Sequence, residues 1–227
     1  MSLKILKKQD KIDEYNFPYT LNPYYGCSLG CLCCYSTQTE WAKRFLEKSG
    51  LKPNEYRSKD NVAKKLRDDL ETLKNLPGRS KKVQIGNGYE PYPDIEEDEK
   101  ITRECLEVFT EHQDWIVHLV TKSKLILRDI EIIKQIRNFQ AEITITTLTH
   151  DKDFEPNAIS TQERLEVIKE LSDAGIFVRT MIMPVLPGYT DITAIKTKSK
   201  QYGAKAHKSK GLNYFSIYRL EIKAGLR

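Results

Sequence analysis

Strand-like and helix-like segments alternate along most of this 227-residue chain. Stretches such as "KVQIGNG" and "IFVRTMIM" read as strands, and the segments between them carry apolar residues at helical spacing. Six strands can be counted, and each except the last is followed by helical sequence. Strands joined by helices cannot form hairpins, because they need crossover connections. The alternation therefore predicts an α/β fold with a parallel sheet and helices outside it.

The expected elements follow one another with short connections. Strands are expected at about residues 19–26, 82–88, 115–121, 141–147, 176–183 and 212–218. Helices are expected at about residues 37–50, 60–75, 97–112, 129–138 and 160–175, and again from residue 191. Six such units suit a partial (β/α)6 parallel barrel, curved and incompletely closed. A flat doubly wound sheet is the alternative, because sequence alone does not fix the order of the strands.

The length of the chain suits one domain with a full hydrophobic core. We expect a single domain over residues 1–227, with a polar leader at 1–17 and the last helix and strand within 190–227. The short carboxyl terminus is expected to leave one side of the barrel open or closed by a partner. The sequence shows neither a signal peptide nor an apolar run of the roughly 18 residues that a membrane span needs. A cytoplasmic location without a membrane partner is therefore expected.

Four of the five cysteines lie in the stretch "GCSLGCLCCY", directly after the first expected strand. An odd count and the absence of a secretion signal argue against a disulfide framework. Cys27, Cys31 and Cys34 have the spacing C-x3-C-x2-C, so one loop can turn three thiolates toward one centre. Cys33 can hardly point to the same centre as its neighbour, and Cys105 shares a helical face with apolar residues. Three thiolates with one vacancy suit a four-iron cluster, whereas structural zinc needs a fourth ligand that is not apparent here.

Polar residues follow the other strands at their carboxyl ends, where parallel α/β folds bind their ligands. Asn87 and Glu90 follow the second strand, and Lys122 follows the third. Thr144 and Thr146 alternate with isoleucines, so both hydroxyls point to one side of the fourth strand. The sequence therefore predicts a polar ligand site beside the cysteine loop.

The cysteine loop resembles the signature of the radical S-adenosylmethionine (SAM) superfamily. Further blocks in the same order narrow the resemblance: "GYEPYPDIEEDEKITRECLE", "VTKSKLILRDIEII", "ITITTL", "FEP", "RLEVIKELSDAGI" and "MPVLPG". Together these blocks are similar to the branch that includes spore photoproduct lyase, from about residue 19 to residue 190.

This resemblance implies a fold, cofactors and roles for individual residues. Cys27, Cys31 and Cys34 would hold a [4Fe-4S] cluster whose remaining iron binds SAM. Reductive cleavage of SAM would give a 5'-deoxyadenosyl radical that abstracts hydrogen from a substrate. An external one-electron donor of the flavodoxin or ferredoxin type is implied. The SAM contacts would be Lys122 to the carboxylate, Thr144 and Thr146 to the ribose or carboxylate, and Asn87 and Glu90 to the amino group.

The sequence departs from the family pattern at three places. Cys33 stands at a position that is commonly aromatic, and we expect it to be a small residue that fills space beside the cluster. The family block Asp-Pro-Tyr-Gln-Pro is replaced by the segment 90–94, "EPYPD", so an acid is kept and an amide is lost. No cysteine follows Cys105, although spore photoproduct lyase needs a late one to return a hydrogen atom. We therefore expect chemistry other than photoproduct repair by the known route, on a substrate that the sequence does not name.

Two other kinds of protein remain as alternatives. The first is a zinc-stabilised nucleic-acid-binding module, with the basic stretch 195–214 on phosphate, although the net charge of +5 is small for such a role. That stretch also suits a solvated helix and loop. The second is an iron–sulfur electron carrier without catalysis, which would normally complete four protein ligands. Nucleic acid is a candidate substrate under the enzyme hypothesis as well, and the oligomeric state is not predicted.

Overall fold

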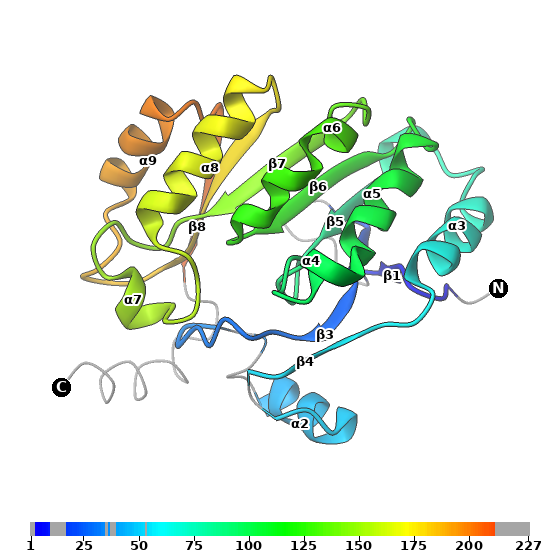
Figure 1. Ribbon diagram of the computed structural model, residues 1–227, viewed down its shortest axis with the longest axis horizontal. Coiled ribbons are helices and arrows are strands. Elements are labelled where there is room, and N and C mark those ends of the chain that lie inside the picture. The colour runs from blue at the N-terminus through cyan, green and yellow to red at the C-terminus, as the bar shows by residue number, and fades with distance from the viewer. Residues whose placement is uncertain (1–2, 10–16, 35, 37–39, 53, 212–227) are drawn as a thin grey trace.

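The computed structural model describes residues 3–9, 17–34, 36, 40–52 and 54–211 (Figure 1). Its main sheet has seven strands in the order β1-β2-β5-β6-β7-β8-β9. These strands are β1 (Lys7–Lys8), β2 (Tyr19–Leu21), β5 (Lys82–Ile85), β6 (Ile116–Thr121), β7 (Phe139–Thr144), β8 (Val178–Val185) and β9 (Ala206–Gly211). β1 pairs antiparallel with β2, and every later pairing in this sheet is parallel.

The parallel strands follow one another in the sheet in the same order as in the sequence. A doubly wound sheet would instead reverse its order at a switch point. The predicted α/β fold with a mostly parallel sheet is confirmed, and the sequential order favours the partial barrel over the doubly wound alternative. The sheet does not close, because β1 and β9 stand at opposite ends of the strand order.

Helices cover one face of this sheet, where α5, α6, α8 and α9 lie side by side (Figure 1). The described helices are α2 (Glu40–Ser49), α3 (Val62–Thr72), α4 (Glu96–Glu99), α5 (Ile101–Thr110), α6 (Ile130–Ile133), α7 (Asp151–Phe154), α8 (Thr161–Asp173) and α9 (Ile192–Gln201), with 3-10 turns η1 (Gly78–Ser80) and η2 (Lys124–Asp129). The hairpin of β3 (Tyr24–Gly26) and β4 (Tyr56–Ser58) lies beyond the sheet together with α2. None of the described helices has both the length and the apolar character that crossing a membrane requires.

The main core lies between the helices and the sheet. Strand residues that face the helices are fully buried, among them Val83, Val117, Leu119, Ile143 and Val178. Each of these residues alternates with a neighbour that points to the inner side of the curved sheet. The inner side includes polar residues such as Gln84, His118 and Glu142.

Two expected elements are each divided into two. The expected first strand is two strands in two sheets, β2 and β3, separated by Asn22 and by Pro23, whose ring nitrogen cannot donate to a ladder. The expected helix 97–112 is interrupted at Lys100, which has a φ of 56°. The Glu96 carboxylate accepts the N–H groups of Thr102 at 2.8 Å and Arg103 at 3.2 Å, so α5 begins with its own cap.

The carboxyl-terminal part of the prediction is only partly tested. Helix α9 begins after Asp191, as expected, and the Asp191 side chain accepts the N–H of Ala194 at 2.9 Å. The predicted strand 212–218 lies outside the described residues. The described part of the basic stretch contains the greater part of α9, where a helix was expected, and then β9, which pairs in parallel with β8, where a loop was expected.

A buried carboxylate organises the inner face of the sheet. Glu142 on β7 is fully buried, and its Oε1 lies 2.9 Å from both His118 Nδ1 and Arg179 Nη1. Its Oε2 accepts a hydrogen bond from Gln84 Nε2 at 3.0 Å. Burial works to raise the pKa of Glu142, but His118, Gln84 and Arg179 outweigh it and lower the pKa below the ordinary 4.5. The four side chains come from four adjacent strands and tie them together.

Replacing this carboxylate is expected to change how stability depends on pH. Because its pKa is lower in the folded state, Glu142 stabilises the fold above pH 4.5 and loses this contribution as the pH falls through the folded pKa. At neutral pH the free energy of unfolding of Glu142→Gln should be about 1–3 kcal/mol lower than that of the wild type. Its melting temperature should also fall less steeply than that of the wild type below about pH 5 in calorimetry. The exposed control Glu104→Gln should follow the wild type, and parallel curves for all three proteins would contradict this role.

Candidate functional site

The cysteine loop follows β3 directly and is held by a segment far along the chain. Leu32 donates its backbone N–H to the Phe154 carbonyl at 2.8 Å. Asn157 donates its backbone N–H to the Leu29 carbonyl at 3.3 Å and its side-chain amide to the Ser28 carbonyl at 2.8 Å. These hydrogen bonds hold the loop that carries Cys27, Cys31 and Cys34 against the segment around α7.

The three cysteines lie close enough for their charges to interact. Cys31 is buried, and Cys27 and Cys34 are half-buried. Burial raises the pKa of Cys27 to about 11, opposed by the backbone N–H groups of Leu29 and Glu90, and the Cys34 charge adds to the increase. Burial also raises the pKa of Cys31, and Cys34 contributes there too. All three thiols therefore belong to one electrostatic cluster, in which thiolates would need positive charge close by.

This donor set fits an iron–sulfur cluster better than a single metal ion. Within the part of the chain that the structure describes, no three His, Cys, Asp or Glu side chains are placed to hold one metal ion. Zinc bound by thiolates at about 2.3 Å would bring their sulfurs to about 3.8 Å from one another. A cluster has its thiolates on separate irons and spreads them farther apart. Three soft sulfur donors carried by one loop are the kind of donor set that holds such a cluster.

Cys33 lies on the protein side of the loop. It is 5% exposed and packs in a small apolar cluster with Cys31, Phe154 and Leu186. Burial raises the pKa of Cys33 to about 12, and the negative charge of Glu155 adds to the increase. This position suits the predicted role as a small residue that fills space.

Lys122 reaches the same region from the end of β6. Its Nζ lies 3.7 Å from Glu155 Oε1, and its side chain is 20% exposed. Burial works to lower the pKa of Lys122, but the Cys31 thiolate and the Glu155 carboxylate outweigh it and raise the pKa. The ammonium is therefore charged, and it interacts with Cys31 in the cysteine loop.

Glu155 and Arg164 form a buried ion pair beneath Lys122. Both side chains are 1% exposed, and Arg164 Nη1 lies 2.6 Å from Glu155 Oε2. Thr146 donates its hydroxyl to Glu155 Oε1 at 2.8 Å, and Arg164 donates to the Thr144 carbonyl at 3.0 Å. Although burial works to raise it, Lys122 and Arg164 lower the pKa of Glu155. The carboxylate is thus ionised and shared between two cations.

Glu90 lies on the other side of the loop and is 7% exposed. Its carboxylate accepts hydrogen bonds from the Thr121 hydroxyl, from the Lys122 backbone N–H at 2.9 Å and from the Tyr92 N–H at 3.1 Å. Burial raises the pKa of Glu90 in spite of these three donors. Its carboxylate links the ends of β5 and β6, and its backbone N–H group lies beside Cys27.

The structure brings most of the predicted site residues together. Glu90 and Lys122 lie beside the cysteines. Thr146 is linked to this group by its hydrogen bond to Glu155. Thr144, two residues earlier in the chain, is buried, with 5% of its surface exposed. Asn87 is exposed in the loop after β5. Sequence reasoning missed Glu155 and Arg164 as members of the site. The available signal was the pair of blocks "FEP" and "RLEVIKELSDAGI", which contain these two residues.

Comparison with known proteins places this geometry in a family. The family model described as "Radical SAM superfamily" matches residues 21–199. An uncharacterized protein of Methanocaldococcus jannaschii is 28% identical over 225 residues, covering 96% of this chain and 78% of that protein. An uncharacterized protein of Mycobacterium tuberculosis is 26% identical over 180 residues, covering 77% of this chain. The chain spans about half of that relative, 52% of its length.

Two solved structures have folds similar to that of this chain. A spore photoproduct lyase variant with bound AdoMet and dinucleoside spore photoproduct superposes with a TM-score of 0.72 at 13% identity. The match covers 99% of this chain and 64% of the lyase. SuiB of Streptococcus suis, bound to the precursor peptide SuiA, gives a TM-score of 0.61 at 17% identity, over 88% of this chain and 40% of SuiB. These likenesses concern the fold. Together with the family match over most of its length, they lead to one conclusion: the chain belongs to the radical SAM superfamily.

Proposed function

We propose that this protein is a radical SAM enzyme in which Cys27, Cys31 and Cys34 hold a [4Fe-4S] cluster. When bound, the cluster and SAM supply reductive cleavage to a 5'-deoxyadenosyl radical that abstracts hydrogen from a substrate. The observation that carries the proposal is the convergence of three buried or half-buried thiols in one loop, next to a charged lysine. Membership of the superfamily supports both cofactors at the level of cofactor class.

The surrounding residues can bind and orient SAM. Lys122 presents an ammonium to which the SAM carboxylate can bind, and Glu155 fixes the direction of that ammonium. The polar groups offered toward the SAM amino group and ribose are Asn87, Glu90, Thr144 and Thr146. Because Glu90 and Thr146 already hold protein partners, they position the site through those bonds as well as through contact with a ligand.

The proposal extends to the chemical class of the substrate. Nucleic acid is a candidate, in keeping with the likeness to spore photoproduct lyase, whose structure holds a dinucleoside photoproduct. An external one-electron donor, such as a flavodoxin or ferredoxin, would supply the electron. We also propose that residues 1–227 form a single domain, since one sheet runs from β1 to β9.

The test is metal analysis followed by turnover. Protein purified without oxygen and reconstituted with iron and sulfide should bind about four irons and show the visible absorbance of a [4Fe-4S] cluster. Addition of SAM and dithionite should release 5'-deoxyadenosine, measured by liquid chromatography. A protein that holds about one zinc and no iron would support the zinc-stabilised module instead. Four irons without any SAM cleavage would defeat the enzyme proposal.

A further inference from the structure

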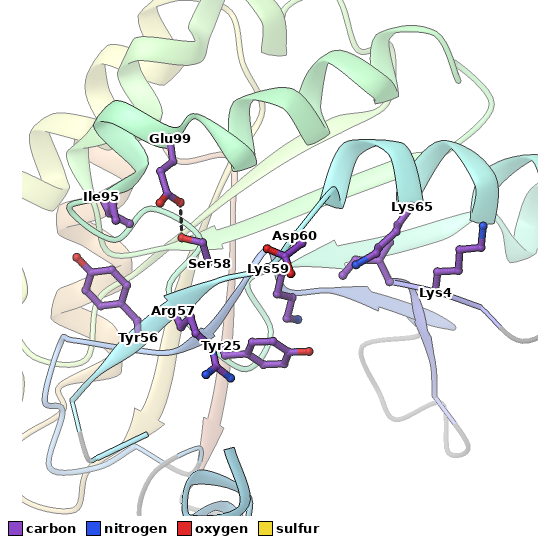
Figure 2. Close-up of a pocket in the computed structure, with 11 residues that line it drawn as sticks. Lys4, Tyr25, Tyr56, Arg57, Ser58, Lys59, Asp60, Lys65, Ile95 and Glu99 are labelled. Carbon is purple, nitrogen blue, oxygen red and sulfur yellow. Dashed lines mark hydrogen bonds between the residues drawn. The ribbon is translucent and has the colours of Figure 1, made fainter. Parts of the chain in front are cut away.

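A cavity of about 750 Å³ is lined by none of the cysteines. It is bounded by the β3–β4 hairpin, the amino-terminal segment before β1 and the start of α3 (Figure 2). Its lining includes the cations Lys4, Arg57, Lys59 and Lys65. None of the cysteines, Glu90, Lys122 or Glu155 contributes to it. The cavity is therefore a candidate site in its own right.

Lys59 is the charged group buried in this cavity, with the residue 9% exposed. Its Nζ donates to the Asn22 carbonyl at 2.5 Å and lies 4.4 Å from the centroid of the Tyr25 ring. Within the described residues, no carboxylate pairs with this ammonium. Burial lowers the pKa of Lys59 to about 8, with the charges of Lys7 and Lys65 contributing to the decrease and that of Cys105 opposing it. Lys59 is thus a buried cation in a locally positive field, which costs stability unless an anion offsets it.

The lining carries more cations than anions, with Lys4, Arg57, Lys59 and Lys65 against Asp60 and Glu99. Lys4 forms an ion pair with Asp68. Glu99 accepts a hydrogen bond from the Ser58 hydroxyl (Figure 2). Arg57 lies 5.7 Å from the same Tyr25 ring and is exposed, so its guanidinium can turn toward a ligand. Asp60 is exposed and forms no ion pair with Lys59 or Arg57 among the described residues. Arg57, Lys59 and Lys65 remain as cations facing the cavity.

We propose that this cavity binds a phosphate group. A guanidinium suits the bidentate recognition of phosphate oxygens, and a lysine supplies a point charge beside it. The volume lies within the range of small-molecule sites, so the phosphate can belong to a nucleotide-sized molecule. The same chemistry would accept a phosphodiester of a nucleic-acid backbone, and the test below separates the two sources.

The cavity also touches the elements that lead into the cysteine loop. The Asn22 carbonyl receives Lys59, while the Asn22 side chain accepts the N–H of Gly88 at 3.0 Å in the loop after β5. Tyr25 belongs to β3, two residues before Cys27. A phosphate held here would lie beside the mouth of the barrel. Binding itself requires neither a cluster nor SAM, so the proposal does not rest on the proposed function.

The test uses the full chain, purified without oxygen, and measures binding by isothermal titration calorimetry at constant ionic strength. The probes are pyrophosphate and a single-stranded DNA 12-mer, with sodium chloride as the reference salt. Lys59→Met keeps the aliphatic stem and removes the charge, and Lys64→Met on the exposed face of α3 is the matched control. We expect at least one probe to bind the wild type and the control alike, and to bind Lys59→Met about tenfold or more weakly.

A stability measurement distinguishes loss of the site from loss of the fold. Because an uncompensated buried cation is removed, Lys59→Met should melt at the same temperature as the wild type or higher when no probe is present. The exposed variant Arg57→Gln should also weaken binding of the probe. It tests the same cavity if Lys59→Met does not fold. Binding of pyrophosphate identifies a small phosphorylated ligand, and binding of the 12-mer alone identifies a nucleic-acid backbone. Absence of binding by both probes, or equal affinity in all four proteins, would overturn the proposal.

Discussion

Replacing Cys31 by alanine is expected to abolish both iron binding and cleavage of SAM. Cys31 is the middle ligand of the proposed set and lies buried beside Lys122, so no water or surface side chain can take its place. A cluster left with two protein thiolates should be lost from the protein, because each remaining bond is then exposed to exchange. Release of 5'-deoxyadenosine should fall by about 10³-fold or more, equivalent to about 4 kcal/mol in activation free energy.

Two other cysteines provide matched controls for this loss. Cys33→Ala removes a thiol from the same loop, and Cys105→Ala removes one from the core under α5. Both variants should keep about four irons per chain after reconstitution, with the absorbance of the wild type. The proposed ligand set would be wrong if Cys33→Ala lost its iron while Cys31→Ala or Cys34→Ala retained it.

Replacing Glu155 by glutamine is expected to destabilise the fold strongly. Arg164 is fully buried, and without the carboxylate its guanidinium would remain charged with no anion beside it. Removing one partner of a buried pair costs about 3 kcal/mol or more. In a chain of this size that loss corresponds to a fall of about 6–12 °C in melting temperature. Thermal unfolding followed by circular dichroism measures the change.

A double variant separates this effect from a general loss of packing. Glu155→Gln combined with Arg164→Met removes both members of the pair and should recover part of the stability, because only Lys122, whose side chain is 20% exposed, is then left without its carboxylate. The exposed control Glu170→Gln, on the same helix as Arg164, should melt within about 2 °C of the wild type. A single Glu155→Gln variant that is as stable as Glu170→Gln would show that the pair does not hold this region together.

Local patterns in the sequence predicted most of the fold. The helix expected at residues 160–175 is present as α8, and Ser160 and Glu163, three residues apart, form both hydrogen bonds of a capping box at its start. The β3–β4 hairpin was missed because its pairing joins residues about 30 positions apart through strands of three residues each. Such short strands carry too little alternation to stand out. The break at Lys100 was missed because it depends on where the Glu96 carboxylate lies in space.

The candidate site divides in the same way. Cys27, Cys31 and Cys34 form a local pattern, so their spacing alone predicted a metal loop. The Glu155–Arg164 pair could not be predicted, since nothing in the sequence says which charged residues are buried together. The cavity around Lys59 could not be predicted for the same reason, because the sequence does not show which of its many lysines is buried.

The hydrogen bonds that shape the cysteine loop determine how early during synthesis the loop could bind the proposed cluster. Its carbonyl and N–H groups pair with Phe154 and Asn157, more than 120 residues farther along the chain. While the polypeptide is emerging from the ribosome, residues 27–34 therefore have no template until the segment around α7 has been synthesised and docked. Cofactor insertion should accordingly follow translation of at least two-thirds of the chain, and a stalled nascent fragment ending before β7 should capture no iron.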